Sequence, residues 1–355
     1  MKKIGIMTIY QNENYGSKLQ SFALQETLKK LGYIGENIKY TIQRKKVLPL
    51  ARICKYPIYF LRIFFRSEIR QRKEKYKSYQ IECIQESDKY LEQISEGEYD
   101  KYICGSDQIW APNQFHGMFF LDFVKDSNKK IAYAPSIGLR KIPNELHGKY
   151  RKLISDIGFL SLREEEGAQL VKSLLQRDVQ VVLDPTLLLT KEEWLEHCGV
   201  FPQRVKEPYI LCYFLGGLFR HKKWLREIQK KTGYKIIVLP IQTTDFFTAK
   251  DKRIDVGPKE FVQWIEHASI VCTDSYHGTI FSVNLNKEFF SFLRFQEGDP
   301  LNQNSRVCNF LDRYGLSDRI VTDQIECRAI HWDEINRKIQ SDRETSIAFL
   351  KNALK

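Results

Sequence analysis

The sequence predicts an α/β protein made of two similar halves that face a cleft. Three observations predict this architecture. Short apolar runs alternate with helical patterns, small or polar residues follow several of these runs, and 355 residues are too many for one ordinary core. Alternating strands and helices are typical of parallel sheets, which bind ligands at their carboxyl edges. We therefore expect an N-terminal domain at residues 1–190 and a C-terminal domain at residues 208–355 that ends in a helical tail.

The composition is that of a soluble globular protein. The apolar run after Met1 is too short for a signal peptide and no apolar run reaches membrane-spanning length, which predicts a cytoplasmic location. The eight cysteines form no Cys-x-x-Cys pair and lie mostly inside apolar runs. We therefore expect reduced core cysteines, and neither a metal ion nor another cofactor.

The net charge of +12 is concentrated between residues 41 and 80, where twelve basic residues face only two acidic ones. No nucleic-acid-binding motif accompanies this charge, so we expect no nucleic-acid partner. The aromatic run Pro57–Phe65 within this segment is flanked by Lys and Arg on both sides. A basic aromatic insertion of this kind, at 44–80, is typical of a membrane-surface segment, although a helical insertion with a solvated basic face explains it equally well.

In the N-terminal half, the first strand is expected at Lys3–Ile9, followed by a polar loop that contains Asn14 and Gly16. Ser17 and Gln20 fit a capping box, which predicts that a helix starts there and ends at the next glycine. A sugar or phosphate can meet Asn14 and the helix start. The full glycine-rich phosphate-loop spacing is missing, however, so a loop with a tight turn is the simpler explanation.

The acidic stretch after residue 80 is predicted to be helical. Four further strands are expected at residues 100–104, 130–136, 158–162 and 179–183. Small and polar residues follow the first of them, and Asp107 among these is a candidate base, sugar-hydroxyl acceptor or helix cap. Arg163 follows the third strand at an expected helix start, where a cation opposes the helix dipole, which indicates a functional role.

A looser pattern at 190–208 predicts the linker between the halves. The C-terminal half then repeats the alternation. Strands are expected at 209–215, 235–240, 270–273 and 288–293, and helices at 220–232, from Pro258, after Gly278 and from Arg306. The two halves therefore present strand ends to a shared cleft.

The strand-to-helix turn at 274–278 is the strongest candidate site. It holds Asp274, Ser275, His277 and Gly278 between an apolar strand and the start of a helix. The free N–H groups of a helix start favour an anion, and the side chains of Ser275 and His277 can add donors. A structural role, with Asp274 and Ser275 as caps and His277 packed beneath the helix, explains the same residues equally well.

Taken together and in order, five motifs resemble the polysaccharide pyruvyl transferase family. They are Asn14-Tyr15-Gly16-Ser-x-Leu-Gln, Tyr102-Ile-Cys-Gly105-Ser106-Asp107-Gln-Ile-Trp110, Ser161-Leu-Arg163-Glu, Leu183-Asp184-Pro185-Thr186 and Thr273-Asp-Ser-Tyr-His277-Gly278-Thr. The resemblance, which runs from residue 3 to about residue 316, implies a GT-B-like fold of two Rossmann-like domains facing a cleft. It also implies transfer of the pyruvyl group of phosphoenolpyruvate to sugar hydroxyls of a bacterial cell-surface or exopolysaccharide precursor, forming a pyruvate ketal.

Some members of the family carry Arg-Leu-His-Gly at the donor site, where this chain has Ser275-Tyr276-His277-Gly278. His277 carries over, whereas Ser275 replaces the arginine. Phosphoenolpyruvate has a carboxylate and a phosphate, so its site needs at least two anion-binding groups. Arg163 and Arg306 are the expected substitutes. The resemblance thus implies donor binding by Arg163, Ser275, His277, Gly278 and Arg306.

Ketal formation needs a proton at the methylene carbon of the donor, attack by a sugar hydroxyl on the adjacent carbon, and departure of phosphate. His277 suits the acid or the partner of the phosphate, and Asp107 or Asp274 the base. The expected acceptor contacts are Asn14, Tyr15, Gly16, Gly105, Ser106 and Trp110. Aromatic faces stack on sugar rings, but core packing explains Trp110 equally well.

Two alternatives stay open from the sequence. The first is a GT-B glycosyltransferase, with the same fold and cleft but a nucleotide-sugar donor. The second is a non-catalytic peripheral membrane or glycan-binding protein, which the basic aromatic insertion suggests. If the chain is an enzyme, this insertion is expected to hold it at the inner face of the plasma membrane, where lipid-linked oligosaccharide acceptors are built.

Overall fold

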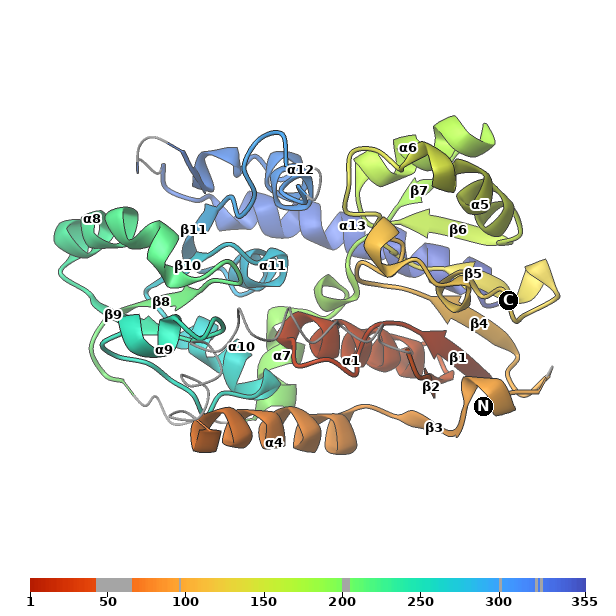
Figure 1. Ribbon diagram of the computed structural model, residues 1–355, viewed down its shortest axis with the longest axis horizontal. Coiled ribbons are helices and arrows are strands. Elements are labelled where there is room, and N and C mark those ends of the chain that lie inside the picture. The colour runs from red at the N-terminus through yellow and green to blue at the C-terminus, as the bar shows by residue number, and fades with distance from the viewer. Residues whose placement is uncertain (43–65, 96, 200–204, 300–301, 323–324, 326–327) are drawn as a thin grey trace, which may run out of the picture.

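The computed structural model describes residues 1–42, 66–95, 97–199, 205–299, 302–322, 325 and 328–355. Its strands form two parallel sheets, one in each half of the molecule (Figure 1). The first sheet has the order β3-β2-β1-β4-β5-β6-β7 and the second the order β12-β11-β10-β8-β9. Together with the covering helices this is the α/β, GT-B-like arrangement of two Rossmann-like units that the sequence predicts.

The strands of the first sheet are β1 Lys3–Met7, β2 Ile34–Lys39, β3 Glu86–Tyr90, β4 Lys101–Cys104, β5 Lys130–Ala132, β6 Phe159–Leu162 and β7 Gln180–Val181. Those of the second are β8 Tyr209–Tyr213, β9 Lys235–Val238, β10 Ile270–Thr273, β11 Glu288–Phe292 and β12 Ile320–Val321. The central strands β1 and β10 are almost wholly apolar and buried, because helices cover both faces of a parallel sheet.

The α-helices are α1 Tyr15–Lys30, α4 Arg66–Cys83, α5 Asn144–Ser155, α6 Glu165–Leu175, α7 Lys191–Cys198, α8 Lys222–Thr232, α9 Asp245–Thr248, α10 Pro258–His267, α11 Tyr276–Asn284, α12 Ser305–Arg313 and α13 Trp332–Ala353. Short 3-10 helices are η1 Leu91–Gln93, η2 Pro112–Gln114, η3 Gly117–Phe120, η4 Ser127–Lys129, η5 Pro185–Leu187, η6 Leu218–His221 and η7 Ser317–Arg319. None of the helices that the structure describes is both long enough and apolar enough to cross a membrane.

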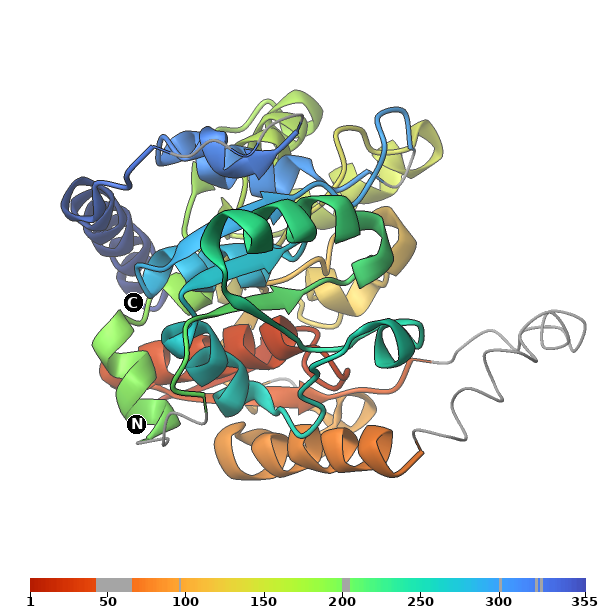
Figure 2. The ribbon, with the colours of Figure 1, turned by 90° about the vertical axis from the view of Figure 1, so that its left-hand side faces the viewer.

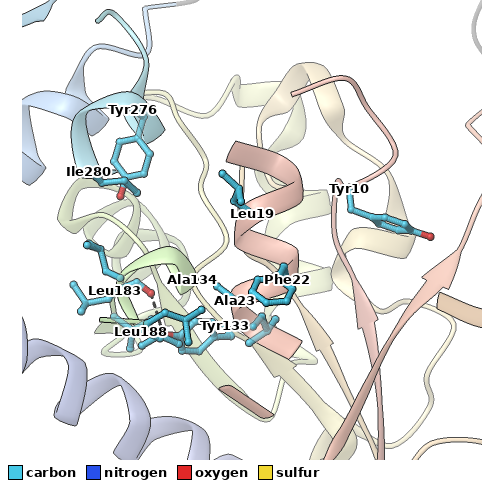
Figure 3. Packing of buried hydrophobic residues seen from close by; sticks show 14 of the residues in the cluster. Tyr10, Leu19, Phe22, Ala23, Tyr133, Ala134, Leu183, Leu188, Tyr276 and Ile280 are labelled. Carbon is cyan, nitrogen blue, oxygen red and sulfur yellow. Dashed lines mark hydrogen bonds between the residues drawn. The ribbon is translucent and has the colours of Figure 1, made fainter. Parts of the chain in front are cut away.

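The two halves share one hydrophobic cluster rather than meeting only at a linker. Figure 3 shows Leu19 and Phe22 of α1 in this cluster, together with Tyr276 and Ile280 of α11. The last helix, α13, runs from the side of the second sheet back to the first (Figure 1). There Ser346 Oγ accepts a hydrogen bond at 3.0 Å from the backbone N–H of Leu183, two residues beyond the end of β7. The domain limits expected at 190 and 208 stay predictions.

Two expected elements differ in the structure. The first helix begins at Tyr15 rather than Ser17, because Asn14 is the N-cap and its Oδ1 accepts from the Ser17 N–H at 3.2 Å. The acidic stretch expected to be helical contains the strand β3, which pairs with β2 at the edge of the sheet. Only Ser87 of this strand is buried, so its polar sequence hides the strand pattern.

The basic aromatic insertion lies mostly outside the described residues, so its expected membrane contact stays a prediction. Its last part, from Arg66, belongs to α4, which packs against both halves and forms the lower edge of the molecule in Figure 2. The ring of Tyr76 stacks on Tyr15 of α1 at a centroid distance of 5.0 Å, and Lys75 forms an ion pair with Glu260 of α10. This helix therefore bridges the two halves.

Candidate active site

A polar cavity of ≈ 220 Å³, here called the donor cavity, lies between the two halves. Residues from the loops after β1, β4, β8, β10 and β11 line it, so the carboxyl ends of strands from both sheets converge there. Five residues singled out from the sequence share this cavity: Asn14, Asp107, Ser275, His277 and Arg306. The carboxyl edges of the two sheets thus face each other, as the alternating pattern predicts.

Gly16 at the start of α1 and His277 at the start of α11 pack directly against each other. A Cβ atom at position 16 would lie 2.6 Å from Cε1 of the His277 ring and closer still to Nδ1 and Cγ. No side chain fits in that space, so the glycine is required by this close approach rather than by a phosphate loop. The contact fixes the His277 ring between the two halves.

Two helices, α1 and α11, begin at the donor cavity. Asn14 caps α1, and Ser275 caps α11 through a hydrogen bond from the Gly278 N–H to its Oγ at 3.3 Å. The first amides of each helix lack partners within the helix and favour an anion. Gly278 itself has a packing role, because a Cβ there would lie 3.0 Å from Cβ of Thr273 and closer still to its hydroxyl.

Two arginines supply the positive charge of the donor cavity. Arg306 on α12 and Arg294 after β11 both reach Gln303, whose Oε1 accepts from Arg306 Nη2 at 3.1 Å and from Arg294 Nη2 at 3.4 Å. Burial lowers the pKa of Arg306 to about 10, with a further contribution from Arg163 nearby, and burial also lowers the pKa of Arg294. Partly desolvated guanidinium groups of this kind are stabilised by an anion between them.

Asp107 is the carboxylate of the donor cavity. It adopts a left-handed backbone conformation with φ 65°, which turns its side chain toward α1. Its Oδ2 accepts from Ser17 Oγ at 2.6 Å and its Oδ1 accepts from the Gln108 N–H at 2.9 Å. A carboxylate oxygen has more than one lone pair, so both oxygens can still accept a proton or a hydrogen bond from a ligand.

Asp274 is the second carboxylate that the sequence offers as a base. It lies outside the donor cavity, where its carboxylate accepts from the backbone N–H groups of Leu215 at 2.6 Å and Gly216 at 2.8 Å. Burial raises the pKa of its carboxyl, against the effect of these hydrogen bonds. In the structure Asp274 therefore holds the loop after β8 in place, and its expected role as a base stays a prediction.

A buried hydrogen-bond network around Asp184, here called the Asp184 network, lies next to His277. The Asp184 Oδ2 accepts from Arg163 Nη1 at 2.8 Å and from Ser106 Oγ at 3.3 Å, and it lies 3.7 Å from His277 Nε2. Its Oδ1 accepts from the N–H and the hydroxyl of Thr186. Burial alone would raise the pKa of this carboxyl, but His277 and Arg163 outweigh burial and hold the pKa well below its usual range.

Arg163 therefore occupies a different place from the one expected. It precedes α6, whose N-cap is Glu164, and the ion pairs with Asp184 and Glu164 offset the unfavourable helix dipole. Its guanidinium lies 4.3 Å from the ring centroid of Tyr276, on the side of a second cavity of ≈ 400 Å³. Arg163 does not line the donor cavity, so of the two expected substitutes only Arg306 does.

Most of the expected acceptor contacts lie in the core instead. Trp110 is fully buried, stacks on Phe120 at 5.0 Å and donates its indole N–H to the Phe119 carbonyl. Tyr15 is stacked between other rings, and its hydroxyl donates to the backbone carbonyl of Val256. These corrections have one cause: an aromatic residue after a strand end carries the same sequence pattern whether it faces the cleft or the core.

Gly105 and Ser106 line neither cavity. A Cβ at position 105 would lie 2.9 Å from the carbonyl carbon of Tyr133, so the glycine allows two chain segments to approach each other. Ser106 is fully buried, and its hydroxyl donates to Asp184 in the Asp184 network. Asn14 is therefore the one expected acceptor residue that lines the donor cavity.

The sequence analysis missed Arg294, Asp184 and Ser17 as site residues. Arg294 follows the strand β11, and its position at the carboxyl end of a predicted strand was an available signal. Asp184 lies within a motif quoted above, but its contact with His277 joins residues 93 positions apart and depends on how the halves pack. No group of three His, Cys, Asp or Glu side chains suited to a metal ion occurs among the described residues.

A family model for polysaccharide pyruvyl transferases matches residues 14–294. The chain belongs to this family. The match includes Asn14, Asp107, His277 and Arg294 and ends before Arg306, so it covers most of the donor cavity. Membership makes the chain a transferase. A sequence search of curated proteins found no match.

Solved structures share the fold at low sequence identity. The UDP-GlcNAc 2-epimerase from Methanocaldococcus jannaschii aligns with a TM-score of 0.52 and 12% identity over 96% of this chain and 92% of that chain. The UDP-GlcNAc 2-epimerase from Neisseria meningitidis bound to UDP-GlcNAc aligns with a TM-score of 0.49 and 12% identity over 99% of this chain and 94% of that chain. The E. coli heptosyltransferase WaaC with ADP-2-deoxy-2-fluoro heptose aligns with a TM-score of 0.38 and 12% identity over 87% of this chain and 99% of that chain. These values describe the fold and not the substrate.

Proposed function

We propose that the enzyme transfers the pyruvyl group of phosphoenolpyruvate to two hydroxyls of one sugar in a bacterial cell-surface or exopolysaccharide precursor, forming a pyruvate ketal. One observation carries the proposal: the donor cavity brings together two arginines, His277 and the N-termini of α1 and α11. Phosphoenolpyruvate carries two anionic groups, and this set of donors offers separate partners for each.

The size of the donor cavity favours a small donor. Its volume of ≈ 220 Å³ falls below the range of roughly 300–1,000 Å³ typical of sites for drug-sized ligands. A nucleotide sugar, the donor of the alternative glycosyltransferase function, is larger than this space and would have to extend beyond the donor cavity. A three-carbon acid with one phosphate suits it better.

The residues of the cavity can be assigned to the steps of ketal formation. His277 delivers a proton to the methylene carbon of the donor, and a sugar hydroxyl attacks the adjacent carbon while Asp107 accepts the hydroxyl proton. Phosphate then leaves with the electron pair of its bond to that carbon, stabilised by Arg294 and Arg306. A second hydroxyl of the same sugar then attacks the same carbon and completes the ketal, and its proton passes to the His277 imidazole, which gave up its own proton in the first step.

The replacement of the family arginine by Ser275 fits this assignment. Ser275 caps α11, and Arg294 reaches the donor cavity from the end of the adjacent strand β11. A guanidinium group binds an anion by its position in space, whatever its position in the chain. Arg294 and Arg306 together therefore replace the missing charge.

The identity of the donor is tested by measuring the midpoint of thermal unfolding of the purified protein with phosphoenolpyruvate and with a panel of nucleotide sugars. A ligand specific to the folded state adds ~2.7 kcal/mol of stability at a hundredfold excess over its dissociation constant. We expect phosphoenolpyruvate to raise the midpoint in the wild type and in the control variant His331→Ala, and not in His277→Ala. His331 is exposed at the start of α13 and is remote in sequence from the donor cavity residues.

A shift with nucleotide sugars alone would refute the donor and support the glycosyltransferase. Deletion of residues 44–65, the part of the basic aromatic insertion before α4, tests the non-catalytic alternative: a binding protein would then lose its activity, whereas an enzyme would still turn over a soluble acceptor. The proposed membrane contact of this insertion is measured separately, by sedimentation of the full chain with anionic and with neutral vesicles.

A further inference from the structure

The second cavity, of ≈ 400 Å³, adjoins the donor cavity and shares Tyr276 and Arg306 with it. It lies between the start of α6 and the helix α12, so both halves of the molecule contribute to it. The ring of Tyr276 lies between the two cavities. The guanidinium of Arg163 lies 4.3 Å from the centroid of this ring, and that of Arg306 lies 5.7 Å from it. A ligand in this second cavity would therefore lie beside a ligand in the donor cavity.

Several residues that line the second cavity carry a buried polar atom with no hydrogen-bond partner among the described residues. Three of these atoms are donors, Arg163 Nη2, Arg306 Nε and Asn309 Nδ2, and one is an acceptor, Glu166 Oε2. Arg163 and Arg306 are each more than nine-tenths buried. A buried donor or acceptor left unpaired is costly, so this cluster indicates a ligand that completes the hydrogen bonds.

The chemistry of the walls identifies the class of ligand. Apolar surface comes from Tyr276, Phe310 and Tyr314, while unpaired donors and an unpaired acceptor lie among them. A sugar ring matches this combination, because its C–H faces pack on aromatic rings and each hydroxyl both donates and accepts. Neither a purely apolar ligand nor one with acceptors alone would satisfy both kinds of atom.

The charges of the two cavities differ in the way that two different substrates require. Five carboxylates line the second cavity against three arginines. Among the described residues of the donor cavity, Asp107 is the one carboxylate against Arg294 and Arg306. An anionic donor is thus favoured in the donor cavity and disfavoured beside the carboxylates of the second, which suits an uncharged ligand.

We propose that the second cavity binds a neutral sugar unit of the acceptor glycan, with its hydroxyls hydrogen-bonded to Arg163, Arg306, Asn309 and Glu166. This inference rests on the proposed transfer function and places the acceptor on the α6–α12 side of Tyr276. Tyr15 and Trp110, the aromatic residues expected at the acceptor from the sequence, are buried in the core. The shared wall then brings a sugar hydroxyl toward the donor cavity.

The test uses Asn309→Ala, because the Asn309 amide nitrogen has no partner in the described structure and its loss removes no hydrogen bond of the fold. Alanine also has the higher helix propensity in α12. The matched control is Asn352→Ala, at an exposed position of the helix α13. Binding of a panel of methyl glycosides of neutral hexoses, deoxyhexoses and N-acetylhexosamines, and of uronic acids, is measured by saturation-transfer difference NMR on the full chain.

We expect a neutral glycoside to bind the wild type and Asn352→Ala alike, and Asn309→Ala roughly two- to tenfold more weakly, the range of one hydrogen bond. The thermal midpoint of Asn309→Ala should not fall. Equal glycoside affinity in Asn309→Ala, preference for a uronic acid, or no binding by any glycoside would overturn the proposal. Phosphoenolpyruvate is titrated in parallel: its failure to bind while a glycoside binds would refute the donor and leave the sugar site standing.

Discussion

The contact between Gly16 and His277 gives the sharpest test of how the two halves form one site. In Gly16→Ala the new Cβ would lie 2.6 Å from Cε1 of the His277 ring, whereas an unstrained contact is about 3.5 Å. The ring must therefore move by roughly 1 Å or more, because the other ring atoms would be closer still. A misplacement of about 1 Å at a reacting group costs on the order of 100-fold in rate.

The stability of this variant should change much less than its activity. Gly16 lies in the first turn of α1, where alanine is favoured over glycine by at most about 1 kcal/mol, and overpacking costs typically 1–3 kcal/mol. We expect a net loss of about 0–2 kcal/mol in chemical denaturation. Turnover of phosphoenolpyruvate, measured as phosphate release with an acceptor, should fall about 100-fold.

The matched control is Gly148→Ala in α5, where a Cβ would meet nothing within 4 Å. This change should leave turnover intact and stabilise the fold by up to about 1 kcal/mol. In the His277→Ala background, Gly16→Ala should cause no further loss, because the two effects share one contact. Near-normal turnover of the single variant Gly16→Ala would refute the reasoning.

Three further predictions follow from the site and its surroundings. Arg294→Gln should abolish the thermal shift with phosphoenolpyruvate and keep glycoside binding; a retained shift would contradict the assignment of the donor cavity. Asp184→Asn should cost up to about 3–5 kcal/mol in chemical denaturation, because the buried Arg163 loses the nearer of its two carboxylate partners and keeps Glu164, whereas the exposed Asp178→Asn should leave the midpoint unchanged. Burial and the neighbouring Arg220 lower the pKa of His221 to about 4, so between pH 6.5 and 4 the unfolded chain binds a proton at this residue that the native state does not. His221 thereby contributes a loss of roughly 3 kcal/mol of stability as the pH falls through this window, beside the contribution of His197, whose pKa burial also lowers to about 4; His221→Phe should remove the contribution of His221 alone.

The fold was accessible from the sequence because periodicity reports burial. The run Ile270–Thr273 is apolar at every position but the last, and it forms a strand buried on both faces of a parallel sheet. The edge strand Glu86–Tyr90 was missed for the opposite reason, since a strand with little burial carries little apolar pattern. The start of α1 was placed two residues late because Asn14 and Ser17 are both good N-caps and their spacing does not decide between them.

The place of a site residue was predictable from the sequence only where that place depends on the strand that the residue follows. His277, Asp107 and Asn14 each follow a predicted strand, and each lines the donor cavity. Trp110 and Asp274 also follow strands, but Trp110 turns into the core and Asp274 binds the backbone of a neighbouring loop. Which way a side chain turns after a strand depends on the packing of other segments, and the local sequence does not record it.

Ser275 and Arg294 divide two requirements of this region, the cap of α11 and the positive charge of the donor cavity. An arginine at the N-cap of α11 would place a cation at the positive end of the helix and lack the oxygen that accepts from the Gly278 N–H. Serine supplies that oxygen, and a cap of this kind stabilises a helix by typically ~1 kcal/mol. The guanidinium is supplied by Arg294 at the end of β11, next to β10 in the sheet, so its charge reaches the same cavity without opposing the helix. Helix stability and anion binding are thereby assigned to different residues, which explains how a family member can lack the arginine of the motif and keep a positively charged donor cavity.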